Sequence, residues 1–252
     1  MKEESVSVKQ GKKALFYLIV QYQTDKIEAE RTIQMGNGNR GNTMIIKNGL
    51  VFTPEGKFEK KDLYVEGEYV AKETTDNKEV EAEGCYVIPG LVDIHFHGCV
   101  RHDMCDGTEE SIQALADYEA ANGVLAICPA TMTIPEEELF QAMNAAREHK
   151  NGKGADLVGI NMEGPFVNKE KKGAQKEEDI KLADVELFHK LQEAAGGLIK
   201  LVDLAPETEG AMDFINQVKD EVHVSIAHTM ADYDTASEAI RRGADHITHL
   251  YN

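Results

Sequence analysis

Residues 87–98 have the sequence VIPGLVDIHFHG. An apolar segment, interrupted at Pro89-Gly90, leads into His95-Phe96-His97. Because side chains alternate between the two faces of a strand, His95 and His97 are predicted to point to one side and Phe96 to the other. Two imidazoles on one side at the end of a strand suit zinc or a similar metal. The alternative is a pair of polar residues in a loop after a buried strand, and the downstream sequence decides between the two.

Downstream of this segment, sequences typical of buried strands alternate with sequences typical of helices. Further strands are predicted at 124–128, 157–162, 199–204, 222–227 and 246–250. Helices are predicted at 108–122, from 135 to about 151, at 184–195, around 212–218 and at 232–242. This alternation predicts parallel βαβ units and an α/β fold, a (β/α) barrel of about six units. Catalytic groups in such barrels lie at the C-terminal ends of the strands.

Metal-ligand side chains occur at four of these predicted strand ends. Besides His95 and His97, they are Glu163, His228 and His249. Each alone has a structural explanation, such as a cap or a hydrogen-bonded strand end, but together they predict a metal site. The other histidines are expected to have no such role: His223 and His246 at strand starts are predicted to be structural, and His102, His149 and His189 to face solvent.

The N-terminal third has a different pattern. Residues 44–86 contain short apolar segments separated by turn sequences at Asn48-Gly49, Pro54-Gly56 and Glu66-Gly67, which predict a small β-sandwich part packed on the barrel. Residues 1–43 have no regular pattern, so we expect a disordered or non-native extension with Met44 as the start of the fold. The barrel is expected to occupy residues 87–252.

Composition excludes several functional classes. The chain of 252 residues has a net charge of −18 and a pI near 4.9. An acidic chain without a Lys/Arg cluster is not expected to bind nucleic acid. The apolar segment near residues 14–20 is too short to span a bilayer, so no membrane association is expected. Four cysteines without CxxC spacing fit reduced thiols in a cytoplasmic protein.

The motifs together resemble a known family. PGLVDIHFHG resembles the first barrel strand of the amidohydrolase superfamily, and MEGPF, KKGAQ, AHT and THLYN resemble the N-acetylglucosamine-6-phosphate deacetylases. The resemblance runs from about Met44 to Asn252. It implies an incomplete (β/α)8 barrel and hydrolysis of the acetamide of N-acetylglucosamine 6-phosphate to glucosamine 6-phosphate and acetate. N-acetylgalactosamine 6-phosphate deacetylation, another amidohydrolase activity and a non-catalytic metal-binding fragment stay as alternatives.

The resemblance also implies roles for particular residues. Glu163, His228 and His249 would hold the main metal, and His95 and His97 would hold a second one with Glu163 as the bridge. One or two divalent ions are expected, zinc first, with iron, manganese or cobalt as alternatives. The substrate-binding positions would be Ala174, Gln175 and Asn252. Lys200 lies near a strand start and is unsuited to be a carboxylated metal-bridging lysine.

The resemblance places the remaining catalytic parts outside this sequence. The catalytic Asp of the family follows the eighth barrel strand, and the groups that bind the sugar phosphate are also expected beyond Asn252. Asp93, on the strand before the histidine pair, is not a substitute. The whole protein is expected to be a homodimer, and residues 1–252 alone are expected to be an inactive fragment.

Overall fold

The computed structural model describes residues 17–21, 43–66, 69–74 and 78–251. It divides into two compact units, Met1–Gly90 and Leu91–Asn252. The boundary therefore falls after Gly90, four residues later than the sequence pattern predicted, because residues 85–89 pair with strands of the first unit. Asn252, one of the predicted substrate-binding residues, lies outside the described residues.

The first unit is a single six-stranded sheet. Its strands are β1 (Tyr17–Gln21), β2 (Met44–Phe52), β3 (Phe58–Glu66), β4 (Tyr69–Ala71), β5 (Glu79–Glu81) and β6 (Cys85–Pro89). The order is β1-β6-β2-β3-β4, with β5 also paired to β2. Ile46, Val51, Leu63 and Val87 form the centre of its small apolar core. The described residues thus form a single sheet, and the β-sandwich part stays a prediction.

Two details of this sheet differ from the sequence prediction. The expected turn at Asn48-Gly49 is a bulge inside the continuous strand β2, because Asn48 adopts a left-handed φ of 61° and the register with β3 shifts there. A Cβ at position 49 would lie 2.6 Å from Val87 Cγ2, which explains the glycine. Within the predicted disordered extension, Tyr17–Gln21 form β1, which pairs antiparallel with β6 because this apolar segment completes the sheet edge. The rest of that extension lies outside the described residues.

The second unit contains the predicted alternation of strands and helices. Besides the short antiparallel pair β8 (Gly98–Cys99) and β9 (His102–Asp103), its strands are β7 (Leu91–Asp93), β10 (Val124–Ile127), β11 (Asp156–Leu157), β12 (Ile160–Met162), β13 (Ile199–Leu204), β14 (His223–Ile226) and β15 (His246–Ile247). They pair in parallel as β7-β10-β11 and β12-β13-β14-β15, and a bridge between Ala130 and Asn161 continues the ladder between the two groups. The predicted third strand is split because β11 pairs with β10 while β12 pairs with β13.

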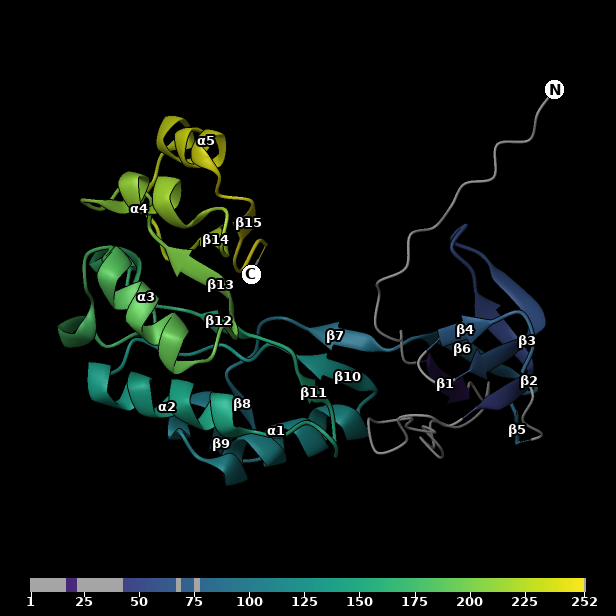
Figure 1. Cartoon of the computed structure of the whole chain (residues 1–252). Coiled ribbons are helices and arrows are strands. Elements are labelled where there is room, and N and C mark those ends of the chain that lie inside the picture. The colour runs from purple at the N-terminus through teal and green to yellow at the C-terminus, as the bar shows by residue number, and fades with distance from the viewer. Residues whose placement is uncertain (1–16, 22–42, 67–68, 75–77, 252) are drawn as a thin grey trace. The chain divides into compact units, whose positions relative to one another are not determined.

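Helices cover one side of these strands (Figure 1). They are α1 (Glu109–Ala121), α2 (Glu136–Glu148), α3 (Val185–Ala194), α4 (Ala211–Val218) and α5 (Tyr233–Arg242). The helix starts predicted at 108, 184 and 232 are confirmed, and Thr108, Asp184 and Asp232 cap them: each accepts a hydrogen bond from a backbone N–H of the first turn. The apolar faces of α1 to α4 meet the strands in one core that includes Ile112, Met143, Phe188 and Phe214.

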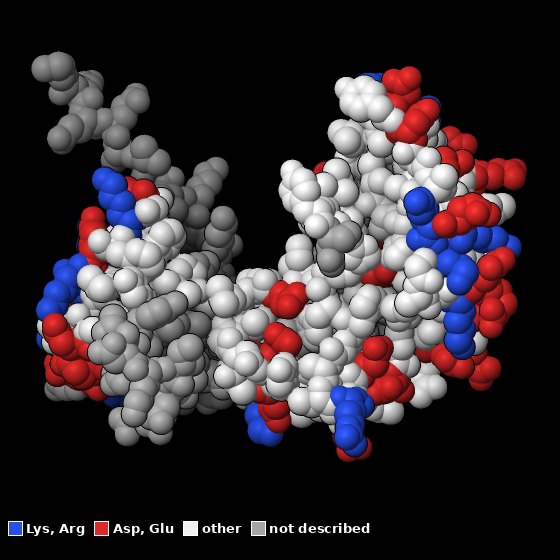
Figure 2. Space-filling view, turned by 180° about the vertical axis from the view of Figure 1, so that it is seen from behind, with Lys and Arg blue, Asp and Glu red and all other residues white. Residues whose placement is uncertain are grey.

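The predicted barrel is present as an open parallel sheet. Among the described residues, β7 and β15 each pair with only one neighbouring strand of the sheet, so closure into a barrel is not observed. None of the helices in the described part of the chain is long and apolar enough to cross a lipid bilayer. On the face shown in Figure 2, Lys and Arg side chains of the described residues are interspersed with Asp and Glu rather than gathered into a basic surface.

Candidate metal centre

Glu163 lies at the centre of the predicted site. It directly follows β12, and it is only 1% exposed. Its Oε1 atom lies 2.6 Å from His228 Nε2 and 2.7 Å from Gln175 Nε2. Its Oε2 atom lies 3.1 Å from His95 Nε2 and 3.2 Å from His97 Nε2. The two carboxylate oxygens therefore face different groups of side chains.

His95 and His97 reach Glu163 from the loop after β7 rather than from the strand itself. The strand ends at Asp93, whose Oδ1 accepts a hydrogen bond from the backbone N–H of His95 at 3.0 Å and so turns the chain. Both imidazoles still approach the same carboxylate oxygen, and Phe96 packs against the apolar core. The predicted division of this segment into a polar and an apolar side is therefore confirmed, although the strand is shorter than expected.

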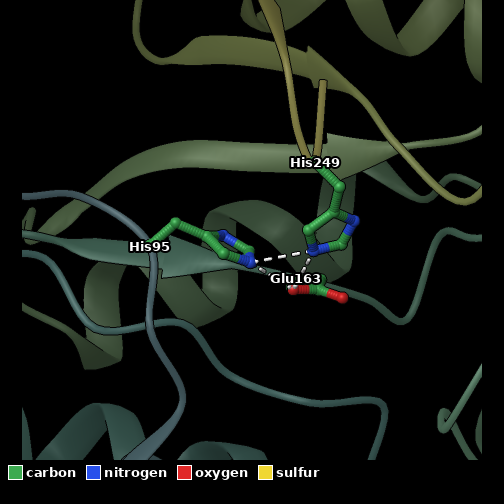
Figure 3. Close-up of side chains that lie close together, drawn as sticks. All are labelled: His95, Glu163 and His249. Carbon is green, nitrogen blue, oxygen red and sulfur yellow. Dashed lines mark hydrogen bonds and ion pairs between the residues drawn. The ribbon is translucent and has the colours of Figure 1, made fainter. Parts of the chain in front are cut away.

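His228 and His249 follow β14 and β15, and both adopt left-handed backbone conformations, with φ of 44° and 56°. Such values are uncommon for residues other than glycine and persist where the surroundings hold them. The Nδ1 atom of His228 donates to the carbonyl oxygen of Lys171 at 2.8 Å, which leaves Nε2 as the nitrogen that faces Glu163. The Nε2 atom of His249 lies 3.0 Å from that of His95 and 3.7 Å from Glu163 Oε2 (Figure 3).

The ionisation of these groups is strongly coupled to Glu163. Burial raises the pKa of this carboxyl, but the hydrogen bond with His228 and the close approach of the His95 and His97 imidazoles outweigh that effect and hold the pKa well below its usual range. Contact with Glu163 in turn raises the pKa values of His97 and His228. Burial lowers the pKa of His249. The site therefore carries a negative carboxylate at neutral pH.

This arrangement fits a bound cation. His95, Glu163 and His249 offer one ligand atom each, and these atoms all lie within 4.8 Å of one another. Glu163 Oε2 is buried and satisfies no hydrogen bond among the described residues, although imidazole nitrogens surround it. A buried charged oxygen without a hydrogen bond is costly, and a metal ion would compensate it. Nitrogen and carboxylate ligands suit zinc, and also iron, manganese or cobalt.

Gln175, one of the predicted substrate contacts, lies buried beside Glu163. It is 2% exposed, and its Oε1 accepts a hydrogen bond from the backbone N–H of Thr133 at 2.5 Å. That bond fixes the orientation of the amide, so Nε2 donates to Glu163 Oε1. Gln175 therefore binds the Glu163 oxygen that does not face His95 and His97. Its neighbour Ala174 is exposed on the same loop, as the substrate prediction requires.

Two supporting residues were missed in the sequence. Asn161 precedes Glu163 by two positions on β12, and its Nδ2 lies 2.8 Å from His95 Nδ1. Period-two alternation along the strand could have identified it as facing the site. Asp203 on β13 is fully buried, and burial raises its pKa to about 7. No local sequence signal distinguishes it from a surface aspartate.

The other residues considered in the sequence lie away from this centre. Lys200 is exposed at the start of β13, and its Nζ donates to Gly197 O at 2.7 Å. His223 at the start of β14 pairs with Asp245 at 2.6 Å. The predicted solvent exposure of His149 is wrong, because its side chain is 1% exposed and packs with Nδ1 3.1 Å from Glu109 of α1. His102, His189 and His246 are partly exposed or on the surface and make no contact with Glu163 in the described part of the chain.

Comparisons with known proteins relate the chain to sugar-phosphate deacetylases. No protein-family model matches the chain. It is 38% identical over 215 residues to an N-acetylglucosamine-6-phosphate deacetylase of Bacillus subtilis, covering 82% of this chain and 53% of that relative. It is 28% identical to an N-acetylgalactosamine-6-phosphate deacetylase of Escherichia coli O157:H7, over 83% of this chain and 57% of the relative.

A solved structure shares the fold. The N-acetyl-D-glucosamine-6-phosphate deacetylase of Mycobacterium smegmatis, in complex with N-acetyl-D-glucosamine-6-phosphate, matches with a TM-score of 0.74 and 26% identity, covering 84% of this chain and 56% of that one. The chain spans about half the length of the relatives it matches. By sequence and by fold, the chain belongs to the N-acetylglucosamine-6-phosphate deacetylase family of amidohydrolases and corresponds to the N-terminal portion of its members.

Proposed function

We propose that this chain is the metal-binding portion of a deacetylase that hydrolyses the acetamide of N-acetylglucosamine 6-phosphate to glucosamine 6-phosphate and acetate. The observation that carries the proposal is the buried Glu163 carboxylate, with the Nε2 atoms of four histidines within 3.7 Å of its oxygens. The relatives of the same family support the choice of reaction.

In this proposal, Glu163, His228 and His249 hold the main ion, and His95 and His97 hold a second ion with Glu163 as the bridge. Zinc is the proposed metal, with iron, manganese or cobalt as alternatives. When bound, a divalent ion acidifies water and polarises an amide carbonyl. The described residues keep the ligands oriented.

Several neighbouring groups orient the ligand side chains in the absence of a metal. The carbonyl oxygen of Lys171 keeps the proton of His228 on Nδ1, and the side-chain amide of Asn161 contacts Nδ1 of His95. His95 is ready to bind a metal through Nε2 when the amide oxygen of Asn161, which has no other hydrogen bond among the described residues, accepts from Nδ1. Gln175 donates to one oxygen of Glu163 and leaves the other facing His95 and His97. Such partners orient metal ligands and typically change metal affinity by about 10- to 100-fold when removed.

The sugar is proposed to bind beside the loop that carries Ala174. The adjacent Gly173 lies next to His228, since a Cβ built at position 173 would be 3.6 Å from His228 Cε1. An exposed backbone at Ala174 is therefore close enough to the centre to meet a sugar whose acetamide reaches the metal. Asn252 is proposed to make a further contact, and the whole protein is proposed to be a homodimer.

Proton transfer to the departing amine is proposed to need a carboxylate beyond Asn252. Of the nearby carboxylates in the described residues, Asp93 accepts a backbone hydrogen bond from His95, and Asp203 is fully buried. General acid–base help typically contributes about 10² to 10⁴ in rate. We therefore expect the 252-residue chain to bind metal without appreciable turnover.

The test combines metal analysis with acetate release. Zinc content is measured after dialysis of the 252-residue chain, and acetate release from both acetylated amino-sugar phosphates is measured for it and for a fusion to the C-terminal portion of the Bacillus subtilis relative. We expect zinc in both proteins and turnover in the fusion, faster with the glucosamine substrate. Faster turnover of the galactosamine substrate would support that alternative, and zinc binding without turnover by the fusion would support a non-catalytic metal-binding fragment. Absence of bound zinc would contradict the proposal.

A further inference from the structure

Asp203 is a buried carboxyl group with no part in the proposed reaction. It lies on β13, is 0% exposed, and its Oδ2 atom has no hydrogen-bond partner among the described residues. Its Oδ1 atom accepts a hydrogen bond from Thr248 Oγ1 at 3.0 Å. Burying a carboxyl group with so few partners is costly, so this contact calls for an explanation beyond packing.

The contact belongs to a hydrogen-bond chain across three strands. Thr248 follows β15 directly, and its hydroxyl also lies 2.7 Å from the hydroxyl of Ser225 on β14. Because Thr248 donates its single proton to Asp203, the hydroxyl of Ser225 is the donor to Thr248. The chain therefore runs from Ser225 through Thr248 to Asp203, and Thr248 is held from two neighbouring strands.

Thr248 is the residue immediately before His249. The strand β15 is only two residues long and pairs with β14 alone in the described residues, so little else fixes its end. One further backbone bond, from Thr248 N to Ile226 O at 3.1 Å, precedes the left-handed turn at His249. The side chain of Thr248 is thus the last anchor before the imidazole that meets His95 and Glu163.

We infer that Asp203 is a positioning residue: through the hydroxyl of Thr248 it holds His249 in the backbone conformation in which its imidazole joins the metal centre. This inference rests on the proposed role of His249 as a metal ligand. No hydrogen bond or ion pair joins Asp203 to a ligand side chain among the described residues. Its effect is therefore expected on metal affinity through His249 and not through the other ligands.

The variants Asp203→Leu, Asp203→Asn and Thr248→Val test this inference in the full chain, with zinc as the probe. Zinc affinity is measured by competition with a chromophoric chelator, and thermal midpoints are measured without zinc. We expect Asp203→Leu and Thr248→Val to lose about 10- to 100-fold in zinc affinity. Asp203→Asn should stay within about threefold of the parent, because its amide oxygen still accepts from Thr248.

A matched control and a double variant separate positioning from packing. Leu201 lies two residues earlier on β13 and is 6% exposed, so Leu201→Ala should lower the thermal midpoint without the loss of zinc affinity. Adding Asp203→Leu to His249→Ala should cause no further loss of zinc affinity, because Asp203 is inferred to act only through His249. An additive further loss, or an unchanged affinity in both Asp203→Leu and Thr248→Val, would overturn the inference. If His249→Ala alone left zinc affinity unchanged, the metal proposal itself would fail instead.

Discussion

Glu163→Gln should abolish tight metal binding while it leaves the fold intact. The two side chains have nearly the same shape. The Nε2 atom of Gln175 donates to the Oε1 position, so the amide oxygen of the variant should take that position and its nitrogen the other. The amide nitrogen would then replace the oxygen that faces His95 and His97. It carries hydrogens and offers no lone pair to a cation.

The magnitude follows from the lost charge. The imidazole nitrogens that define the site lie 3.1 to 3.7 Å from Glu163 Oε2, so a bound ion would be within about 4 Å of the carboxylate. At an effective dielectric constant near 20, a pair of unit charges at that separation contributes about 4 kcal/mol, and a divalent ion with the carboxylate about twice that. Even the smaller value corresponds to about a thousandfold loss of zinc affinity.

The assay is a chelator-competition titration with zinc, accompanied by circular dichroism to confirm folding. The control is Glu170→Gln, which removes the same charge from an exposed position of the neighbouring loop. We expect the control to stay within about threefold of the parent, because exposed charges are screened. A Glu163→Gln variant that folds and binds zinc as tightly as the control would refute the assignment of Glu163 as the central ligand.

Three further outcomes are expected. Glu163→Ala should remove more bound metal than His95→Ala, as measured by elemental analysis, because Glu163 serves both proposed ions; equal losses would count against the bridge. Gln175→Leu should weaken zinc binding by about 10- to 100-fold, because Glu163 loses its supporting donor, and an unchanged affinity would instead favour a role at the substrate. Burial raises the pKa of Asp203 from 3.8 to about 7, so its contribution to the stability of the metal-free protein is present below pH 3.8 and lost as the pH rises through 7. Asp203→Asn should therefore flatten the dependence of the thermal midpoint on pH between 4 and 8, and a parent-like slope would contradict that cause.

The alternation of strands and helices in the second unit could be predicted, because the sequence patterns that mark helix starts and core faces are local. Capping residues such as Thr108 and Asp232 mark helix starts, and apolar periodicity marks the core faces. The split of the predicted third strand was not visible, because Leu157 to Met162 has the mostly apolar pattern of one strand and the break depends on which neighbouring strand each half pairs with. Gly159 lies between β11 and β12, where the strand is broken. A side chain does not fit there, because a Cβ at this position would lie 2.5 Å from Lys200 Cγ.

The ligands of the candidate site were more predictable than their supports. Glu163, His228 and His249 were found because strand ends in a parallel sheet meet at one edge, which is a property of chain order. Gln175 and Asp203 depend on contacts between distant segments, and their local sequences are typical of exposed loops and strand surfaces. His149 was placed in solvent because charged residues surround it, whereas Glu109 from another helix covers it. Burial of a polar side chain is set by tertiary contacts that no single segment encodes.

The position of the ligands couples metal binding to the ends of the open sheet. His95 follows β7 and His249 follows β15, and these strands are the two edges of the ladder among the described residues. Their Nε2 atoms are nevertheless 3.0 Å apart beside the same Glu163 oxygen, so ions held by Glu163 with His249 and by Glu163 with His95 would join the two edges. Zinc at about 100 times its dissociation constant should raise the free energy of unfolding by about 2.7 kcal/mol. For a unit of this size the thermal midpoint should rise by about 5 to 11 °C.

The link between the two edge strands also predicts which amides zinc should protect from hydrogen exchange. Amide hydrogen exchange of residues 91–97 and 246–249 should slow on zinc addition more than exchange in the central strands β10 and β13, because the edges otherwise open first. The Glu163→Gln variant provides the control, since it should show neither the rise in midpoint nor the local protection. Zinc that binds but slows exchange in the central strands as much as at the edges would show that the ion does not join β7 to β15, and the ligand set would have to be reassigned.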